Sequence, residues 1–279
     1  IILLGVRDSL QTKRAVLRNF PVIGHFRYLL EKIRPEINQY FIESNTDGMP
    51  FNRNMRSVAY QRAKPVLETL PFVTQRDVYE VGYEWFNHSI LATEAAKNPR
   101  IRIGEGRARM PYDASVYNIS AMSFGSLSAN AVLALNGGAK IGGFFHNTGE
   151  GGISDYHLEH GGDLVWQIGT GYFGCRNRDG TFNEEEFTKN AAQPTVRMIE
   201  IKLSQGAKPG HGGILPAKKV SAEIARIRGV EMGEDVLSPP GHSAFRTPRE
   251  LLTFVDKLRE LSGKHVGFKI CVSHSAEFL

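Results

Sequence analysis

The segment MIEIKLSQGAKPGHGGILP, residues 198–216, joins two contrasting kinds of sequence. Its first six residues form an apolar run typical of a buried strand, and the run stops at Ser204 and Gln205. The remainder holds four glycines, two prolines and a single lysine, Lys208. Glycine lets a backbone turn through positive φ and approach a ligand closely. The segment therefore predicts a strand that ends in a polar, ligand-binding loop.

The same order of apolar run and glycine-rich turn recurs through the second half of the chain. The predicted strands are Val116–Met122, Phe144–Asn147, Leu164–Ile168, Met198–Leu203 and Val266–Val272, with Val236–Leu237 as a weaker sixth. The residues TPRE, 247–250, supply a capping box and a proline at the first helical position, so they predict the start of a helix. Strands that alternate with helices indicate a parallel α/β sheet, either open or closed into a barrel.

The first part of the chain is aromatic, charged and poor in glycine. One helical face carries Val22, Phe26, Leu29, Leu30 and Ile33. Pro35 is expected to end that helix. We therefore expect a helical or irregular extension over residues 1–112 and an α/β domain over residues 113–279.

Composition excludes several classes of protein. The chain has 34 Lys and Arg against 29 Asp and Glu, and its charge of +5 is spread without a basic block, which argues against nucleic-acid binding. Two cysteines cannot form a disulfide framework, an iron–sulfur site or a typical structural zinc site by themselves. A reducing, cytoplasmic setting fits this usage. The opening Ile-Ile-Leu-Leu lacks a methionine, so a membrane anchor upstream of residue 1 is also expected.

Ligands of α/β proteins bind at the carboxyl ends of the strands, where four loops of this chain are rich in glycine. These loops are SAMSFGSLS (120–128), HNTGEGG (146–152), GTGYFGC (169–175) and SQGAKPGHGG (204–213). One such loop is adequately explained as a tight turn. Four in succession, each with small polar residues, favour a flat polar ligand that lies across the strand ends.

Two side chains of the 204–213 loop are candidates for binding that ligand. Lys208 is a cation among glycines whose N–H groups can point inward, an arrangement that stabilises a developing anion. It also fits a solvated loop lysine. Gln205 offers both a donor and an acceptor, as the recognition of a ring edge requires, although an ordinary strand cap explains it equally well.

Three stretches of the chain resemble the FMN-binding synthase domain of glutamate synthase. They are NTGEGG (147–152), EIKLSQGAKPGHGGILPAKKVSAEIARIR (200–228) and LSPPGHSAFRTPRELLTFVDKLRE (237–260). The resemblance covers about residues 40–279 and is greatest to the shorter FMN-binding proteins that lack an amidotransferase part. It implies a (β/α)8 TIM barrel that holds FMN. The implied reaction reduces 2-iminoglutarate, formed from 2-oxoglutarate and ammonia, to L-glutamate.

The resemblance also implies roles for individual residues. Flavin contacts fall on Ala121, Met122, Ser123, Gln167, Lys208 and Lys269. Substrate binding falls on Gln205 and on Arg228, which would pair with a carboxylate. The implied catalytic residues are Lys208, Gln205 and Glu150, the last in a loop that communicates with the ammonia entrance. No metal site is expected, because no pair of histidines has ligand spacing.

Departures from the family pattern leave alternatives open. His211 and Ile214 stand where Glu and Gln are usual, so a flavin oxidoreductase for another amino or N-methylamino acid is one alternative. A non-catalytic subunit is another. His211 fits either a proton donor or a surface histidine.

Two further expectations concern what lies outside the chain. The cysteines that bind the family's iron–sulfur cluster are absent, and about three more βα units are expected after residue 279. The sequence therefore resembles a fragment, a truncated frame or one piece of a split protein. No dinucleotide fingerprint is present, so a ferredoxin or a separate NAD(P)H reductase subunit is the expected electron donor.

Overall fold

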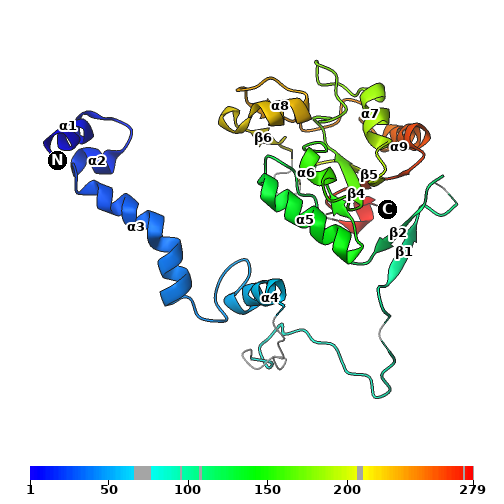
Figure 1. The fold of residues 1–279 in the computed structure, drawn as a ribbon, viewed down its shortest axis with the longest axis horizontal. Helices are drawn as coiled ribbons and strands as arrows, with labels where there is room; N and C mark the ends of the chain where they lie inside the picture. The colour runs from blue at the N-terminus through cyan, green and yellow to red at the C-terminus, as the bar shows by residue number, and fades with distance from the viewer. Residues whose placement is uncertain (66–76, 95, 107–108, 206–209, 273, 279) are drawn as a thin grey trace. The chain divides into compact units, whose positions relative to one another are not determined.

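The computed structural model describes residues 1–65, 77–94, 96–106, 109–205, 210–272 and 274–278 (Figure 1). The chain separates into two compact units, Ile1–Ala92 and Thr93–Leu279. The domain boundary at residue 112 stays a prediction, because compact units of backbone need not coincide with domains that fold independently. Each unit is described by itself.

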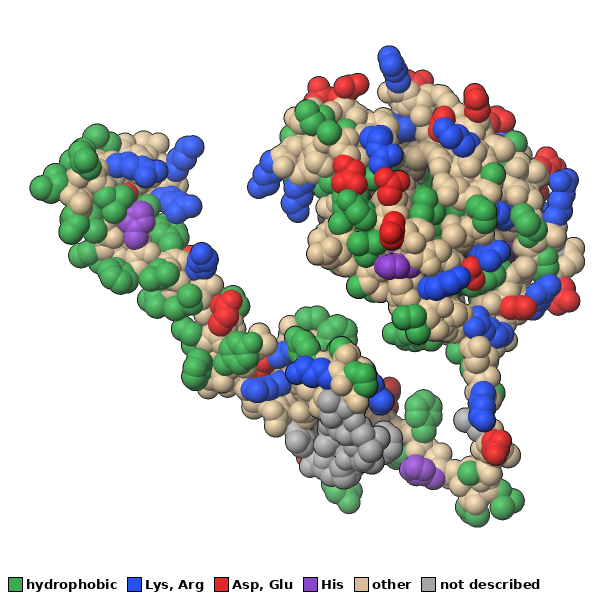
Figure 2. Space-filling model, viewed as in Figure 1, with side chains coloured by type: hydrophobic (Ala, Val, Ile, Leu, Met, Phe, Trp, Pro, Cys, Tyr) green, Lys and Arg blue, Asp and Glu red, His purple; other side chains and the backbone are tan. Residues whose placement is uncertain are grey.

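The first unit is helical. Its elements are α1 (Ile2–Leu10), α2 (Ala15–Asn19), α3 (Gly24–Ile37), the π-helix η1 (Asn38–Ile42) and α4 (Arg53–Ala63). The buried Asp8 carboxylate accepts a hydrogen bond from the Val22 backbone at 2.9 Å and lies 2.9 Å from His25 Nε2, so it ties α1 to the start of α3. Many apolar side chains of these helices lie at the surface (Figure 2).

The expected helix end at Pro35 is wrong, because α3 continues through this proline to Ile37. Proline removes one backbone donor, which leaves the Glu31 carbonyl without its helical partner. Glu31 is exposed, so water can satisfy that carbonyl. Within the described ranges, no helix is both long and apolar enough to cross a bilayer.

The second unit is a mixed α/β structure around a parallel sheet of four strands. The sheet order is β3 (His146–Asn147), β4 (Leu164–Ile168), β5 (Val196–Lys202) and β8 (His265–Lys269). Two small antiparallel sheets accompany it, β1 (Arg100–Ile103) with β2 (Tyr112–Ser115) and β6 (Ile214–Leu215) with β7 (Val236–Leu237). The helices are α5 (Ala129–Gly142), α6 (Asp155–Leu158), α7 (Glu184–Ala191), η2 (Ala217–Lys219), α8 (Ala222–Arg228), α9 (Pro248–Ser262) and α10 (Ser275–Phe278).

The expectation of five or six parallel strands is corrected to four, and the described residues do not form a closed barrel. Residues 116–122 contribute only a one-residue bridge from Ile119 to His146. Val116 and Tyr117 are 60% and 73% exposed, so the first apolar residues of the expected strand face solvent. Strand β7 pairs antiparallel with β6 and lies outside the main sheet.

The alternation of side chains gives the main sheet one apolar and one polar face. On the first face, Trp166, Ile199 and Val266 pack in one buried cluster with residues of α7 and α9. On the opposite face, the register aligns Gln167 with Glu200 and Lys202 with Lys269. Since a strand points successive side chains to opposite faces, charged groups gather on one side of the sheet without disturbing the core.

The capping box at the start of α9 is confirmed. Thr247 Oγ1 accepts from the Glu250 N–H at 3.3 Å, and Glu250 Oε2 accepts from the Thr247 N–H at 3.1 Å. We expect Thr247→Ala to lower the free energy of unfolding by about 1 kcal/mol, because it removes one of these bonds. Urea denaturation measures this change. The control is Thr253→Ala within the same helix; a loss as large in the control would contradict a role for the cap.

Candidate functional site

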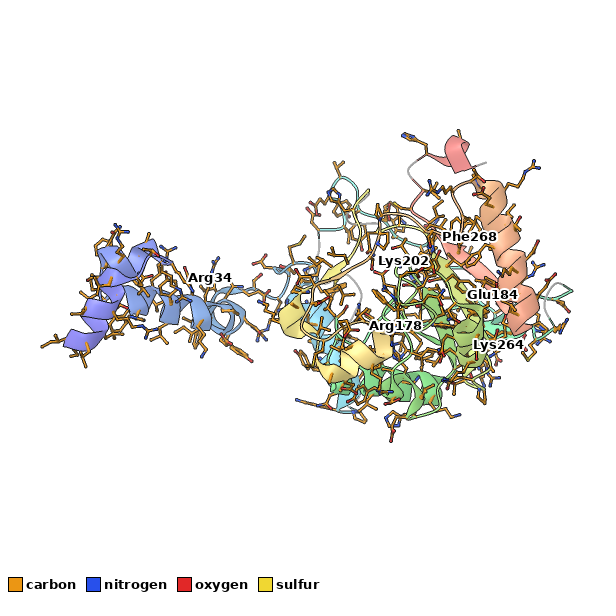
Figure 3. All side chains as sticks on the ribbon, turned by 90° about the horizontal axis from the view of Figure 1, so that it is seen from above. Arg34, Arg178, Glu184, Lys202, Lys264 and Phe268 are labelled. Atoms are coloured by element: carbon orange, nitrogen blue, oxygen red, sulfur yellow. The ribbon has the colours of Figure 1, made fainter. Side chains whose placement is uncertain are left out.

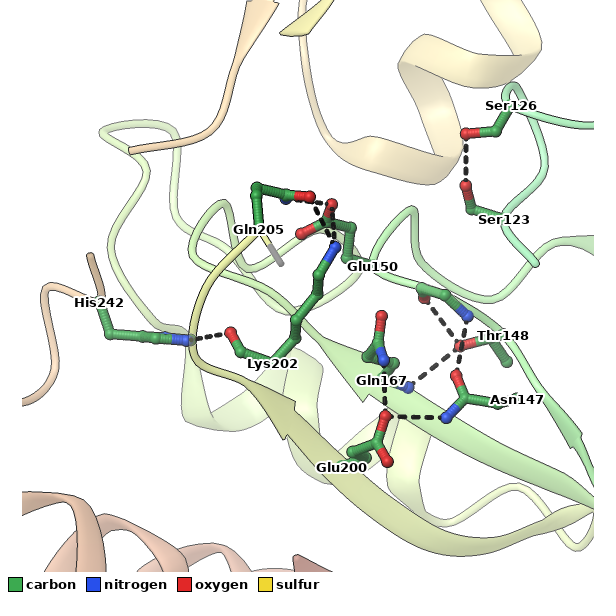
Figure 4. A network of polar contacts seen from close by, with 11 residues as sticks. Ser123, Ser126, Asn147, Thr148, Glu150, Gln167, Glu200, Lys202, Gln205 and His242 are labelled. Atoms are coloured by element: carbon green, nitrogen blue, oxygen red, sulfur yellow. Dashed lines mark hydrogen bonds and ion pairs between the residues drawn. The ribbon is translucent and has the colours of Figure 1, made fainter. Parts of the chain in front are cut away.

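Three side chains meet at the carboxyl end of β5, where Lys202 is the last residue (Figure 4). Lys202 Nζ donates to Glu150 Oε1 at 2.9 Å and to Gln205 Oε1 at 2.8 Å. Gln205 Nε2 donates to the same Glu150 oxygen at 2.5 Å. The Lys202 and Glu150 side chains are only 15% and 22% exposed, so water weakens their attraction less than at a surface. We call these three residues the Glu150 cluster.

A second group of polar side chains lies on the same face of the sheet, two residues before Lys202 along β5. Glu200 Oε1 accepts from Gln167 Nε2 at 2.5 Å and from Asn147 Nδ2 at 2.9 Å. The Gln167 amide oxygen is buried and has no hydrogen-bond partner among the described residues. Glu200, Gln167 and Asn147 form the Glu200 network. Within this network, the amide oxygen of Gln167 is an acceptor without a donor among the described residues.

Arg228 ends α8 and is only 6% exposed. Its Nη2 donates to the Phe124 carbonyl at a long 3.4 Å, and its guanidinium carbon lies 5.0 Å from the centroid of the Phe173 ring. No carboxylate of the described residues forms an ion pair with it, and its Nε has no partner there. Burial lowers the pKa of Arg228, and the charge of Glu150 opposes this effect. A buried cation without an anion is costly, so this position suits an anionic ligand.

The predicted flavin residues at 121–123 lie close to Arg228. A Cβ built on Gly151 would be 2.9 Å from Ser123 Cβ and 3.0 Å from Arg228 Nη2, so both side chains border one point. Ser123 Oγ and Ser126 Oγ are 2.8 Å apart. The Met122 N–H already donates to Asn147, and its carbonyl accepts from His157. The Met122 N–H is therefore already hydrogen-bonded within the protein and is not available to a flavin. Ala121, the residue before it, is partly buried.

Two glycines show why these loops avoid side chains. Gly149 has a φ of 66°, and a Cβ there would lie 2.8 Å from the Ser123 nitrogen. A Cβ on Gly169 would lie 2.8 Å from Glu150 Cβ. These two glycines thus allow the loops to pack on one another. From the sequence alone, this reason for a glycine could not be distinguished from close approach of the backbone to a ligand.

Of the two lysines predicted to contact the flavin, the structure describes only Lys269. Lys269 lies on the strand next to Lys202, is exposed, and has no side-chain partner among the residues described. The two lysines place positive charge at the carboxyl end of the sheet, whereas Lys264 precedes β8 at the opposite end (Figure 3). Lys208 lies outside the described residues.

Two buried histidines near the site hold neighbouring parts of the chain by hydrogen bonds. His242 Nε2 donates to the Lys202 carbonyl at 2.8 Å, which leaves Nδ1 to accept from the Tyr172 hydroxyl at 3.0 Å. His157 Nε2 donates to the Met122 carbonyl at 3.0 Å. Burial lowers the pKa of both imidazoles, so both are held neutral. Across the described ranges, no group of three or more His, Cys, Asp or Glu residues could hold a metal ion.

His146, at the start of β3, should make the fold sensitive to acid. It is fully buried, neither ring nitrogen has a hydrogen-bond partner among the described residues, and burial together with His157 lowers its pKa from 6.5 to about 4. Between these values the unfolded chain binds a proton that the folded chain does not. Stability is therefore lost as the pH falls from about 6.5 to about 4, by about 2 kcal/mol near pH 5.

The variant His146→Phe keeps a ring at this position and removes its titration. We expect urea denaturation to show a smaller loss of stability from pH 7 to pH 5 in the variant than in the wild type. Equal losses in the two proteins would assign the acid sensitivity to other groups.

The polar face fits a flavin in the chemistry of its groups. The Gln167 oxygen requires an N–H donor, which the imide edge of an isoalloxazine ring provides. Lys269, on the strand next to the ion pair of Lys202 and Glu150, supplies positive charge that would stabilise a reduced, anionic ring. Ser123 adds a hydroxyl group at the border of the same site.

Fold and site together define an α/β protein with a ligand site at the carboxyl ends of parallel strands. The sequence profile described as "Conserved region in glutamate synthase" matches residues 80–279. The chain belongs to this family, and the resemblance found in the sequence is confirmed.

Curated relatives agree with this assignment. The chain is 36% identical, over an alignment 313 positions long, to "Glutamate synthase large subunit-like protein YerD" of Bacillus subtilis, and the alignment covers 98% of this chain and 59% of the relative. It is 38% identical over 160 residues to "Archaeal glutamate synthase [NADPH]" of Methanocaldococcus jannaschii, covering 57% of this chain and 29% of that protein. The chain thus spans well under two thirds of the length of these relatives.

Lys202, Glu200 and Asn147 are functional candidates that sequence reasoning missed. The run MIEIKL was treated as a uniform apolar strand, yet its polar members fall at alternate positions. A period of two places Met198, Glu200 and Lys202 on one face, opposite Ile199 and Ile201. Charges at alternate positions near the end of a buried strand were the available signal.

Proposed function

We propose that this protein is a flavin-dependent oxidoreductase of the glutamate synthase type, which reduces 2-iminoglutarate to L-glutamate. The observation that carries the proposal is Arg228, a buried guanidinium that has no carboxylate partner among the described residues, at the border of a site that also contains the Glu150 cluster. Family membership supports the reaction class. The substrate, cofactor and complete (β/α)8 barrel are parts of the proposal.

Arg228 is proposed to bind a carboxylate of the 2-oxo acid. A guanidinium binds a carboxylate through two parallel hydrogen bonds, and its unused Nε and weakly bonded Nη2 leave donors for them. Because Phe124 and Phe173 flank the group, water competes weakly for the ion pair. Gln205 is proposed to hold the substrate from the side of the Glu150 cluster.

The Glu150 cluster is proposed to handle ammonia and protons. The Glu150 carboxylate, which already accepts a hydrogen bond from the Lys202 ammonium group, can bind a substrate ammonium ion and take a proton from it. The carboxyl group can then return that proton to the imine nitrogen. Lys208 remains a predicted contributor of positive charge at this site. Bound FMN, once reduced by the electron donor, would supply the hydride for reduction of the imine carbon and would return to its oxidised form. Gln167, Lys269 and Ser123 are proposed to hold its ring.

The electron donor is proposed to be a ferredoxin or a separate NAD(P)H reductase. The archaeal relative is named for NADPH, which favours reducing equivalents from that source. Residues 1–279 contain no dinucleotide fingerprint, so the nicotinamide would bind outside these residues. Both cysteines are free, which agrees with a reducing compartment.

The proposal is tested by turnover of the FMN-loaded protein with an artificial reductant, ammonium and a panel of 2-oxo acids. We expect L-glutamate from 2-oxoglutarate at a higher kcat/KM than any product from a monocarboxylic 2-oxo acid. A flavin-loaded protein that forms no amino acid with any member of the panel would refute the reaction class.

A second candidate is reduction of another imine, from a different 2-oxo acid or from methylamine. It rests on Ile214, an apolar residue that is 55% exposed. Ile214 follows Gly213, where a Cβ would lie 3.4 Å from Gln205 Nε2 and 3.8 Å from Glu150 Oε1. An apolar residue in the segment next to the Glu150 cluster favours a less polar substrate group. Higher kcat/KM with such a substrate than with 2-oxoglutarate would select this candidate.

A further inference from the structure

The orientation of the Gln167 amide is fixed by its neighbour. An ionised carboxylate accepts hydrogen bonds and cannot donate them. The Gln167 group that lies 2.5 Å from Glu200 Oε1 must therefore be the NH2 end. The amide oxygen then points away from Glu200, toward the side on which Glu150 and Lys202 lie (Figure 4).

Glu200 is held in place for this task. Asn147 Nδ2 donates to the same Glu200 oxygen at 2.9 Å, and the Asn147 oxygen accepts from the Gly149 N–H at 3.0 Å. The Gln167 backbone N–H is bound to Thr148 Oγ1 at 3.1 Å, so the main chain is also fixed. Residues of β3, β4, β5 and the loop after β3 thus determine a single amide orientation.

This arrangement leaves a buried acceptor without a donor. The Gln167 oxygen has no partner in the described part of the chain, and an unmade hydrogen bond at a buried oxygen is costly. Such exceptions in native proteins call for an explanation, and a ligand donor is one. No positive group forms an ion pair with Glu200 among the described residues, so its charge serves the two amides.

We propose that Glu200 is a positioning residue, which presents the Gln167 oxygen to an N–H donor on the edge of the cofactor ring. This inference rests on the proposed function, because it takes the ligand to be the flavin. The flavin group concerned is its imide N–H, the only donor between the two ring carbonyls. The network would then select a ring with that proton and disfavour one without it.

The test compares binding of FMN and 3-methyl-FMN, in which a methyl group replaces the imide proton. Fluorescence titration of the apoprotein gives the dissociation constant of each. We expect the wild type to bind FMN about 10- to 100-fold more tightly than 3-methyl-FMN. In Glu200→Gln the neighbouring side chain can donate or accept, so the Gln167 amide is free to turn. The preference for FMN should then fall below about threefold.

The control is Glu185→Gln, which removes the same charge from an exposed position on α7 and should keep the wild-type preference. Equal binding of the two flavins by the wild type would overturn the inference and leave the proposed function standing. A preference retained in Glu200→Gln would assign it to steric exclusion of the methyl group and also overturn the inference. Failure of the wild type to bind either flavin would refute the proposed cofactor itself.

Discussion

Replacing Arg228 with methionine is expected to lower kcat/KM for the 2-oxo acid by at least about 100-fold, with the fold retained. The guanidinium is the buried cation that we assign to the substrate carboxylate, and methionine fills similar space without charge. Because Arg228 has no ion pair among the described residues, its loss breaks no buried pair. The free energy of unfolding should stay within about 1 kcal/mol of the wild type or rise.

The matched control is Arg226→Met, two residues earlier on α8. Arg226 is exposed and forms a surface ion pair with Asp155 at 2.7 Å, so its loss should leave kcat/KM unchanged. Steady-state kinetics and urea denaturation of both variants supply the comparison. Unchanged kcat/KM in Arg228→Met would remove Arg228 from the substrate site. A large loss of stability would identify it as a structural residue.

The second large effect is expected at Glu150. Glu150→Gln keeps an oxygen for Lys202 and a similar shape, yet it removes the charge proposed to receive ammonia and exchange a proton. We expect kcat to fall by about 100- to 1,000-fold, with a smaller change in the KM for the 2-oxo acid. The measurement is initial rate against both ammonium and 2-oxo acid.

The control for this variant is Glu234→Gln, at an exposed position. It removes the same charge and should leave kcat unchanged. An equal decrease of kcat in both variants would point to net charge. Wild-type kcat in Glu150→Gln would exclude the Glu150 cluster from the chemistry.

Sequence periodicity predicted those parts of the fold whose local signals and burial agree. Leu164–Ile168 forms β4 as expected, and the helix after Thr247 begins at its capping box. The strand expected at Met198–Leu203 is β5, which begins two residues earlier. In each case the apolar residues join one buried cluster of the sheet, α7 and α9, so packing and propensity favour the same structure.

Other elements depend on tertiary partners that a local pattern cannot reveal. Residues 116–122 have strand-like composition, yet they bridge β3 only at Ile119. The apolar pair Val236–Leu237 forms a strand that pairs with β6 and not with the main sheet. A local pattern also does not show that the two amides of the Glu200 network share one oxygen, because that sharing requires the register between three strands.

Motifs marked some members of the candidate site, and the roles assigned to them stay predictions. Glu150 and Gln205 were both named from the resemblance and are hydrogen-bonded to one another, while Lys202, their common partner, was hidden inside an apolar run. Arg228 was predicted from the motif alone; its burial without an ion pair among described residues comes from the packing of α8 against Phe124 and Phe173.

The central claim is that reduced flavin in this site passes its electrons to an imine of a 2-oxo acid. The most direct measurement is the anaerobic reoxidation of the FMN-loaded, reduced protein, followed by flavin absorbance after mixing. We predict rapid reoxidation with 2-oxoglutarate and ammonium together, and little with either alone. A protein that binds flavin and stays reduced with every combination of 2-oxo acid and amine would contradict the claim, and would favour a non-catalytic role for this chain.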